Sequence, residues 1–432
     1  MTGSEHSLDV YSGKIYIAQL TLIDDQLHWH YCKNWQQSGY AISPHLPLQS
    51  DIPLLNIQRF LRNLLPEGNG LDELVSNFHL SKTNTFGLIR ALGMDTPGSL
   101  IILPPNQKLP SKHSFRIITD DELEARLDAR DEFSLIIWDG KPRLSVAGVQ
   151  DKINVVINKN GQVGFGEGSL CSTHILKFEK QKLSHLVINE LITMQLARQC
   201  GLNVANVKLL RYGKHPALLI ERFDRHLISM NDVKRRHIID GCQALNLSPD
   251  HKYERNFGSG RDVAHIRDGA SLIRLFDFAN LCANPALVKQ QMLDWVLFNL
   301  LVFNYDAHGK NISFFVGSNG LTLTPFYDLV NIKMYSDFEH EMAMGLGDEF
   351  DGNIVNAYQL ADFADNCQLP RHLIAKRLNL LINKLRASLD KEISSVACNN
   401  KEKSYLELYQ SMIFKRCKHL EQEVGYIRSI EL

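Results

Sequence analysis

A polar stretch that follows a long apolar segment carries the clearest chemical pattern in this chain. Asp306 is followed by Asn311 five residues later, and Asp328 lies seventeen residues beyond Asn311. Phosphoryl transfer from ATP uses this set of residue types, because one carboxylate accepts the proton of the acceptor hydroxyl while an Asn and a second carboxylate hold Mg²⁺. The spacing therefore indicates a metal–phosphate site. The alternative is a polar turn after a helix, in which Asp and Asn satisfy backbone groups.

The segments on either side of this set could position it. Residues 293–303 are almost all apolar, a pattern typical of a helix buried in a core, and such a helix could hold the polar loop rigidly at its end. Residues 312–316 and 321–324 flank a Gly-Ser-Asn-Gly turn, which predicts a β-hairpin that returns Asp328 to the side of Asn311. An isolated Asp-to-Asn spacing would favour the polar turn, whereas the hairpin and the second Asp favour the metal–phosphate site.

A kinase-like loop would require a phosphate-binding region and a lysine upstream, and both have candidates. Residues 144–152, which include Gly148, separate two apolar segments and predict a flap whose backbone N–H groups can face phosphate oxygens. Residues 172–178 have the pattern of a strand that carries Lys177, and lysine is rarely buried without a partner. Lys177 is therefore a candidate phosphate ligand. An edge-strand lysine that points to water is the alternative.

For two more segments the sequence allows either a role in the site or an ordinary structural role. Glu190 lies in the predicted helix after Lys177, where it either pairs with that lysine or is a solvated helix residue. Residues 217–225 predict an apolar strand that ends in a charged turn, and Glu221 and Phe223 stand where a kinase hinge offers backbone groups to adenine. Taken alone, that segment is an ordinary exit from a strand into a loop.

Together these motifs resemble the HipA-type toxin Ser/Thr kinase family. The resemblance rests on residues 145–152 (Ser-Val-Ala-Gly-Val-Gln-Asp-Lys), 174–177, 221–225, 240–245, 252–254 and 306–311. Residues 64–68 and 92–100 are similar to the small domain that precedes the kinase in full-length members. The similarity covers most of residues 8–335 in the family's order. Val149 and Asp151 depart from the commoner Ala and Glu, Tyr305 and Gly309 occupy variable positions, and no motif matches beyond about residue 390.

The resemblance assigns roles to individual residues. It implies that Asp306 is the catalytic base and that Asn311 and Asp328 hold Mg²⁺. It also implies that ATP is bound by Val146, Ala147, Gly148, Lys177, Glu221, Phe223, His308, Lys310, Asn311 and Asp328. Ser145 corresponds to the autophosphorylated serine of the family, and its phosphate would repel ATP phosphates and expel the flap from the site. The alternative for Ser145 is a turn residue whose hydroxyl caps a backbone N–H.

Composition is compatible with this interpretation. The chain has 432 residues, 44% of them hydrophobic and 22% charged, which predicts an ordinary globular protein of two or three domains. The net charge of −1 does not require broad attachment to nucleic acid or membrane. No long apolar run or signal peptide is present, so the cytoplasm is the expected location. The eight cysteines are scattered without a Cys-x-x-Cys pair, which favours reduced thiols and argues against structural zinc.

The fold class expected is α+β, a two-lobed kinase-like fold with a small N-terminal α/β accessory domain. The Pro- and Lys-rich residues 103–112 form the clearest linker. The predicted domains are the accessory domain at 1–105, a strand-rich N-lobe with the phosphate flap at 106–240, and a helical C-lobe with the catalytic loop and metal site at 241–432.

The function expected is an ATP- and Mg²⁺-dependent serine/threonine protein kinase that autophosphorylates on Ser145. The resemblance implies a toxin of a toxin–antitoxin system, with a helix-turn-helix antitoxin of HipB type as its partner. It further implies DNA contact mainly through that antitoxin, and a protein substrate such as an aminoacyl-tRNA synthetase. One alternative is a small-molecule phosphotransferase of aminoglycoside-kinase type, which would need neither Ser145 nor the N-terminal domain. The other is a non-catalytic interaction scaffold, which the intact candidate site residues disfavour.

Overall fold

The chain contains both helices and strands and divides into two compact units. The computed structural model describes residues 6–110, 112–144, 150–180, 183–229, 232–338 and 340–431. Unit 1 comprises Met1–Lys180, Lys208–Ile239 and Phe314–Gly320, and unit 2 comprises Gln181–Val207, Asp240–Ser313 and Leu321–Leu432. This division follows compactness alone, and the domain boundaries near residues 105 and 240 stay a prediction.

Unit 1 begins with an antiparallel sheet of four strands in the order β3-β2-β1-β4. Its strands are β1 (Ser7–Ser12), β2 (Ile15–Ile23), β3 (Gln26–Tyr31) and β4 (Leu100–Leu103). Between β3 and β4 the chain forms α1 (Lys33–Ser38), α2 (Leu54–Arg62), α3 (Gly68–Phe78) and α4 (Thr85–Leu92). Helix α2 packs on β3 and α4 packs on β4. In β1 the alternating apolar residues Leu8 and Val10 are fully buried.

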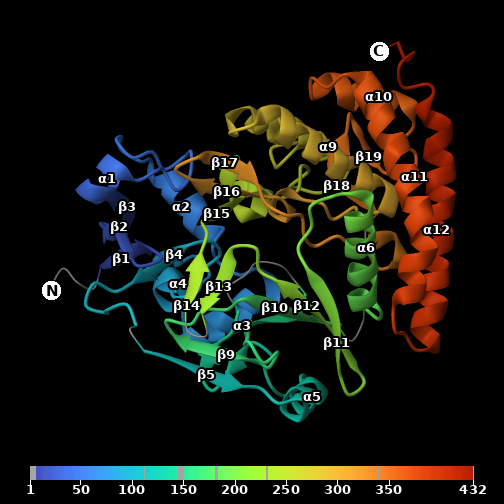
Figure 1. Cartoon of the computed structure of the whole chain (residues 1–432). Helices are drawn as coiled ribbons and strands as arrows, with labels where there is room; N and C mark the ends of the chain where they lie inside the picture. The colour runs from blue at the N-terminus through green and yellow to red at the C-terminus, as the bar shows by residue number, and fades with distance from the viewer. Residues whose placement is uncertain are drawn as a thin grey trace. The chain divides into compact units, whose positions relative to one another are not determined.

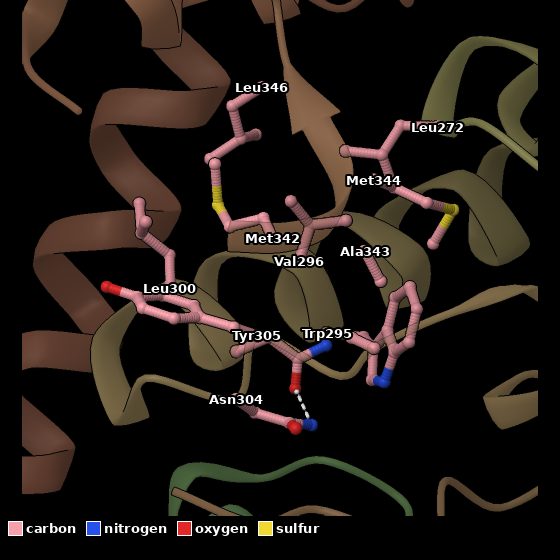
Figure 2. A pocket seen from close by; sticks show the side chains of 12 residues that line it. Leu272, Trp295, Val296, Leu300, Asn304, Tyr305, Met342, Ala343, Met344 and Leu346 are labelled. Atoms are coloured by element: carbon pink, nitrogen blue, oxygen red, sulfur yellow. Dashed lines mark hydrogen bonds between the residues drawn. The ribbon is translucent and has the colours of Figure 1, made fainter. Parts of the chain in front are cut away.

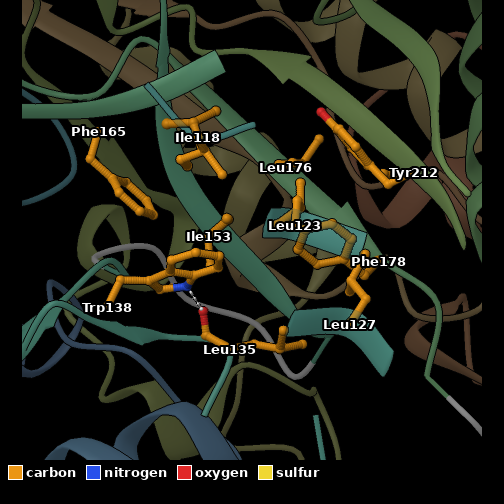
Figure 3. Close-up of a cluster of buried hydrophobic side chains, with 12 residues drawn as sticks. Ile118, Leu123, Leu127, Leu135, Trp138, Ile153, Phe165, Leu176, Phe178 and Tyr212 are labelled. Carbon is orange, nitrogen blue, oxygen red and sulfur yellow. Dashed lines mark hydrogen bonds between the residues drawn. The ribbon is translucent and has the colours of Figure 1, made fainter. Parts of the chain in front are cut away.

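A second, six-stranded sheet in unit 1 has the order β11-β12-β10-β8-β9-β5. Its strands are β5 (His113–Ile117), β8 (Lys152–Ile157), β9 (Val163–Gly168), β10 (His174–Phe178), β11 (Val207–Tyr212) and β12 (His215–Glu221). Helix α5 (Asp120–Asp128), capped by the Thr119 side chain, contributes Leu123 and Leu127 to the buried cluster drawn in Figure 3. Leu176 and Phe178 of β10 join this cluster, so the residue between them faces the opposite side of the sheet.

Short strands complete the β-structure. The two-stranded pairs are β6 (Ile137–Trp138) with β7 (Lys141–Pro142), β13 (Arg225–Ser229) with β14 (Asp232–Arg235), and β18 (Glu341–Leu346) with β19 (Glu349–Asp351). Strands β15 (Ile238–Asp240), β16 (Ser313–Gly317) and β17 (Gly320–Leu323) form a three-stranded sheet in that order. Because β16 and β17 are neighbours joined by a short turn, the predicted hairpin before Asp328 is confirmed.

Unit 2 is mainly helical. Its α-helices are α6 (Leu186–Cys200), α7 (Gly241–Ala244), α8 (Leu272–Phe278), α9 (Pro285–Val302), α10 (Ala357–Asn366), α11 (Arg371–Ser395) and α12 (Asn400–Val424). Single 3₁₀ turns lie at Pro249–His251, Ala279–Leu281, Gly309–Asn311 and Ile332–Met334. Helix α11 packs against α6, α9 and α12, and the two long C-terminal helices run beside each other in Figure 1.

The C-terminal residues, for which the sequence offers no motif, are part of this helical packing. The Tyr409 hydroxyl of α12 is fully buried and lies 2.9 Å from the Thr193 hydroxyl of α6. Arg416, also on α12, donates to the carbonyl oxygen of Leu300 in α9. Helix α12 therefore forms side-chain hydrogen bonds with both α6 and α9.

Two chemical properties of the described residues follow from the coordinates. All eight cysteines are free thiols. None of the described helices combines the length and the apolar character that a bilayer crossing requires.

Candidate active site

The polar loop that begins at Asn304 is fastened to the end of α9. The helix is buried along most of its length and ends at Val302. The next residue, Phe303, has a φ of 56°, in the left-handed region that bulky residues rarely adopt. The backbone N–H of Asn304 donates to the Asn299 carbonyl oxygen over 2.9 Å, and its side-chain amide donates to Asn299 Oδ1 over 3.0 Å. This double contact fixes the direction in which the chain leaves the helix.

A small cavity of about 30 Å³ lies directly beneath this loop (Figure 2). Its apolar lining includes Met342 and Met344 of β18, and its polar lining includes Asn299 and Asn304. The Asn299 Nδ2 and Asn304 Oδ1 atoms are buried there without a hydrogen-bond partner among the described residues. A space of this size accommodates about one water molecule, so it is a packing feature under the loop and is too small for a nucleotide.

Asp306 is held by three hydrogen bonds. Its carboxylate accepts one from the Tyr253 hydroxyl over 2.8 Å. Its backbone carbonyl oxygen accepts two more, from the Asn311 side-chain amide and from the His308 backbone N–H, both over 2.8 Å. The candidate base and the candidate metal ligand Asn311 are thus parts of one closed loop. The polar-turn alternative accounts for the backbone contact of Asn311, but it does not account for the carboxylate of Asp306, which is directed at Tyr253.

His308 and Lys310 are buried inside the same loop. The Lys310 ammonium forms an ion pair with Asp240 Oδ2 over 2.5 Å, in which the lysine side chain is buried and the aspartate side chain is 13% exposed. Asp240 also caps α7 by accepting the Gln243 backbone N–H over 2.8 Å. The loop is therefore tied to a second helix through a lysine that sequence reasoning assigns to ATP binding.

Glycine at two positions allows this close approach. A Cβ placed on Gly309 would lie 2.6 Å from the Ala270 Cβ, and one placed on Gly241 would lie 2.4 Å from the Gly309 carbonyl oxygen. Both separations are far shorter than a van der Waals contact. The family resemblance places Gly309 at a variable position of the loop. In this structure a larger residue there would clash with Ala270.

Asp328 follows the hairpin and has a φ of 59°, in the left-handed region that Asp tolerates better than most residues. The residue before it, Tyr327, donates from its hydroxyl to the Lys310 carbonyl oxygen over 2.7 Å. Lys310 directly precedes Asn311, so this bond joins the neighbours of the two candidate metal ligands. An amide oxygen and a carboxylate are ligand types that fit a hard cation such as Mg²⁺, which commonly takes one or two carboxylates plus phosphate oxygens. Among the described residues, no cluster of three or more His, Cys, Asp or Glu offers a richer metal site.

Lys177 lies in the interior of the six-stranded sheet of unit 1. Strand β10 pairs with β8 on one side and β12 on the other, and Lys177 stands opposite Lys152 and Leu218. Lys177 is 6% exposed and faces away from the hydrophobic cluster of Figure 3. The edge-strand alternative is therefore wrong. Lys152 is likewise buried, at 5% exposed, and stands opposite Lys177 on the same face of the sheet.

Glu221 and Phe223 occupy the end of β12 and the turn that follows it. Glu221 is exposed, and the Phe223 ring packs edge-on against Phe315 of β16 with the centroids 5.9 Å apart. The neighbouring Arg222 and Asp224 are buried and form a bidentate ion pair. An ordinary exit from a strand into a loop does not bury an ion pair. The conformation of this turn is therefore fixed by the Arg222–Asp224 pair.

The remaining candidates stand as follows. Glu190 is fully buried in α6, so the alternative of a solvated helix residue is wrong. Ser145, Val146, Ala147 and Gly148 lie outside the described residues, and their roles stay predictions. Sequence reasoning did not assign Tyr253 or Asp240 to the site, although both belong to the segments that carry the family resemblance.

Comparison with known proteins agrees with this architecture. Residues 8–103 match the HipA N-terminal domain, and residues 144–392 match the HipA-like C-terminal domain. The chain is 46% identical over 435 residues to the serine/threonine-protein kinase toxin HipA of Shewanella oneidensis, with full coverage of both proteins. It is 30% identical over 351 residues to Y4mE of Sinorhizobium fredii, covering 78% of this chain and 81% of that protein.

A solved structure gives the same result in three dimensions. The Shewanella oneidensis complex of HipA, HipB and operator DNA contains a chain that matches with a TM-score of 0.92 and 46% identity, covering 98% of this chain and 100% of that one. The expected α+β, two-lobed kinase-like fold is thereby confirmed. The chain belongs to the HipA family of serine/threonine-protein kinase toxins.

Proposed function

We propose that this chain transfers the γ-phosphoryl group of ATP to a serine or threonine of another protein, as the toxin of a toxin–antitoxin pair. The hydrogen-bonded loop from Asp306 to Asn311 carries the proposal, because it combines an oriented carboxylate with the side-chain amide of Asn311. The same loop accepts a hydrogen bond from Tyr327, the residue before Asp328. In this assignment Asp306 accepts the proton of the attacking hydroxyl. Membership in the HipA family supports the same chemistry.

The family resemblance assigns the metal and nucleotide ligands individually. Asn311 and Asp328 would bind Mg²⁺, which neutralises charge on the β- and γ-phosphates when bound. Lys177 would contact the phosphates from a sheet face that also carries the buried Lys152. Glu221 and Phe223 would bind adenine, and His308 and Lys310 would contribute to the ATP site from the catalytic loop. Val146, Ala147 and Gly148 would cover the phosphates.

The test is phosphoryl transfer from labelled ATP in the presence of Mg²⁺. Wild-type protein is expected to label itself and serine or threonine residues of a protein substrate, with aminoacyl-tRNA synthetases as the first candidates. Asp306→Asn keeps the shape of the side chain but removes its basicity, so transfer should fall by about 10² to 10⁴-fold. Thermal stability and ATP binding should stay close to wild type. Near-normal turnover of Asp306→Asn would contradict the proposal, and labelling of an aminoglycoside instead of protein would favour the small-molecule alternative.

We further infer that the chain pairs with an antitoxin of HipB type and contacts operator DNA mainly through it. The support is the 0.92 TM-score to the HipA chain of a complex that also contains HipB and operator DNA. The net charge of −1 gives the chain itself little general attraction for DNA. Coexpression with a HipB-type protein should yield a stable complex that retards operator DNA, whereas the toxin alone should retard it weakly. Strong retardation by the toxin alone would contradict this assignment.

A further inference from the structure

Residues 95–98, a loop of the N-terminal domain, form hydrogen bonds and an ion pair with the turn that carries Glu221 and Phe223. All of these residues belong to unit 1. The Asp224 carboxylate accepts a hydrogen bond from the Gly98 backbone N–H over 2.8 Å. The Arg225 guanidinium donates to the carbonyl oxygens of Gly98 over 2.5 Å and Thr96 over 2.6 Å. Arg225 also forms an ion pair with Asp95 over 3.2 Å. Four contacts thus join residues 95–98 to Asp224 and Arg225, well over a hundred residues further along the chain.

These contacts belong to a buried network of charges. Arg222 forms a bidentate ion pair with Asp224, with distances of 3.0 and 2.8 Å, and Arg225 Nη1 lies 2.7 Å from the same carboxylate. The side chains of the two arginines are 2% and 0% exposed. Burial alone would raise the pKa of Asp224, but the two guanidinium groups lower it well below its ordinary value. A paired carboxylate of this kind is costly to disrupt, because breaking the pair leaves buried charge uncompensated.

Asp95 closes the network from the N-terminal side through Ser172. The Ser172 hydroxyl donates to Asp95 Oδ2 over 2.6 Å and accepts from Arg222 Nη1 over 2.9 Å. Asp95 therefore contacts Arg225 directly and Arg222 through one hydroxyl. Gly98 makes the approach sterically feasible, since its φ is 77° and a Cβ there would lie 2.9 Å from His237 Nδ1.

The network residues alternate with the candidate adenine ligands. Arg222 separates Glu221 from Phe223, and Asp224 follows directly. The Arg222 backbone N–H also donates to the Thr173 carbonyl oxygen over 3.0 Å, which joins the turn to the segment before β10. Because both arginines and Asp224 are fixed by several bonds each, the backbone at Glu221 and Phe223 has little freedom to move. Kinase hinges bind adenine through such backbone groups, so their placement decides how well adenine fits.

We infer that Asp95, together with the backbone of Thr96 and Gly98, positions the adenine-binding turn, so that the N-terminal domain contributes to nucleotide affinity and base selectivity. This inference rests on the proposed function, in which Glu221 and Phe223 bind adenine. It makes Asp95 and Ser172 positioning residues that act through Arg222 and Arg225. A purely architectural role is the alternative, and it would affect stability without affecting the choice between ATP and GTP.

The experiment compares Asp95→Ala and Ser172→Ala with wild type in steady-state kinetics with ATP and with GTP. Asp95→Ala removes a charge-assisted contact, so the KM for ATP should rise about tenfold while kcat stays within about twofold. The KM for GTP should change little, because guanine does not use the adenine-specific backbone contacts. The preference for ATP over GTP should therefore fall. Ser172→Ala should give the same pattern with a smaller rise, and it tests the inference even if Asp95→Ala does not fold.

Asp294→Asn is the matched control. Asp294 is a buried carboxylate of α9 that pairs with Arg377 of α11, so both residues belong to unit 2 and not to the unit that contains the turn. It should lower thermal stability and leave the ATP-to-GTP preference unchanged. An unchanged preference in both Asp95→Ala and Ser172→Ala would overturn the inference.

Phe223→Pro tests the adenine assignment separately, because proline removes the backbone N–H that would face adenine. If Phe223→Pro leaves the KM for ATP unchanged, the adenine assignment itself is wrong. If Phe223→Pro raises that KM but the Asp95 and Ser172 variants do not, the adenine assignment stands and the positioning role of the N-terminal domain is wrong.

Discussion

The Tyr253 hydroxyl donates a hydrogen bond to the Asp306 carboxylate over 2.8 Å, although 53 residues separate the two in the chain. Tyr253 also packs its ring edge-on against His308, with the centroids 5.2 Å apart. The tyrosine thus contacts two members of the catalytic loop at once. A carboxylate that must meet an incoming hydroxyl gains from such support, because catalysis depends strongly on orientation.

Tyr253→Phe removes the hydroxyl and keeps the ring against His308. We expect kcat to fall about tenfold, the typical effect of losing a hydrogen bond to a charged group, while the KM for ATP stays near wild type. Phosphate transfer to a fixed protein substrate measures both constants. Tyr358→Phe is the control, because Tyr358 is an exposed tyrosine of the same unit. Equal kcat values for wild type and Tyr253→Phe would show that the hydrogen bond has no catalytic importance.

Asp328→Ala tests the metal site. ATP with Mg²⁺ should raise the melting temperature of the wild type more than ATP alone, because a ligand that binds the native state stabilises it by mass action, by about 3 kcal/mol at a hundredfold excess over Kd. The variant should respond to ATP but lose the part that depends on Mg²⁺. Thermal shift with and without Mg²⁺ makes the comparison, with the exposed Asp337→Ala as control. A full Mg²⁺-dependent shift in Asp328→Ala would rule out its role as a ligand.

The parts of the site that local patterns encode could be predicted from the sequence. The apolar run before Asn304 is the buried helix α9, the Gly-Ser-Asn-Gly turn joins β16 to β17, and Lys177 lies on a strand. Each of these depends on residues that are neighbours in the chain, where hydrophobic periodicity and turn chemistry are informative.

The supporting contacts could not be predicted in this way, because they join distant segments. Asp240 pairs with Lys310 across 70 residues, and Asp95 pairs with Arg225 across 130. A single Asp or Arg in a sequence does not reveal its partner, and burying either residue is favourable only once the partner is in place. The same reason explains why the turn at Glu221 resembles an ordinary loop until the network around it is seen.

His237 gives unit 1 a defined response to acid. Its ring is 2% exposed and donates from Nε2 to the Ile42 carbonyl oxygen over 2.9 Å. Burial lowers the pKa of His237 from 6.5 to about 4, so the folded protein resists protonation while the unfolded chain accepts a proton. Its contribution to stability is therefore fully present above about pH 6.5 and is lost as the pH falls toward 4.

His237→Gln keeps a donor for Ile42 and removes the titration. Between pH 7 and pH 4.5 the free energy of unfolding of the wild type should fall by about 2 kcal/mol more than that of the variant, because each pH unit between the unfolded and folded pKa values corresponds to at most about 1.4 kcal/mol. Urea unfolding at the two pH values measures the difference. His113→Gln is the control, since His113 is exposed on β5. An identical pH dependence in wild type and His237→Gln would contradict the assignment.

Ser145→Ala should remove the main site of autophosphorylation. The family resemblance places the modified serine at this position, directly before the phosphate-covering residues 146–148. A phosphoserine carries close to two negative charges, so a phosphate on Ser145 should weaken ATP binding through repulsion from the phosphates of the nucleotide.

Mass spectrometry after incubation with ATP and Mg²⁺ should find the main phosphate on Ser145 in the wild type. In Ser145→Ala no other residue should be phosphorylated to the same extent. Nucleotide titration should then give weaker ATP binding for phosphorylated wild type and unchanged binding for Ser145→Ala treated in the same way. Ser114→Ala, at an exposed serine of β5, should behave like the wild type. A main phosphate elsewhere, or undiminished ATP binding with Ser145 modified, would leave the kinase assignment intact and remove this means of self-inhibition.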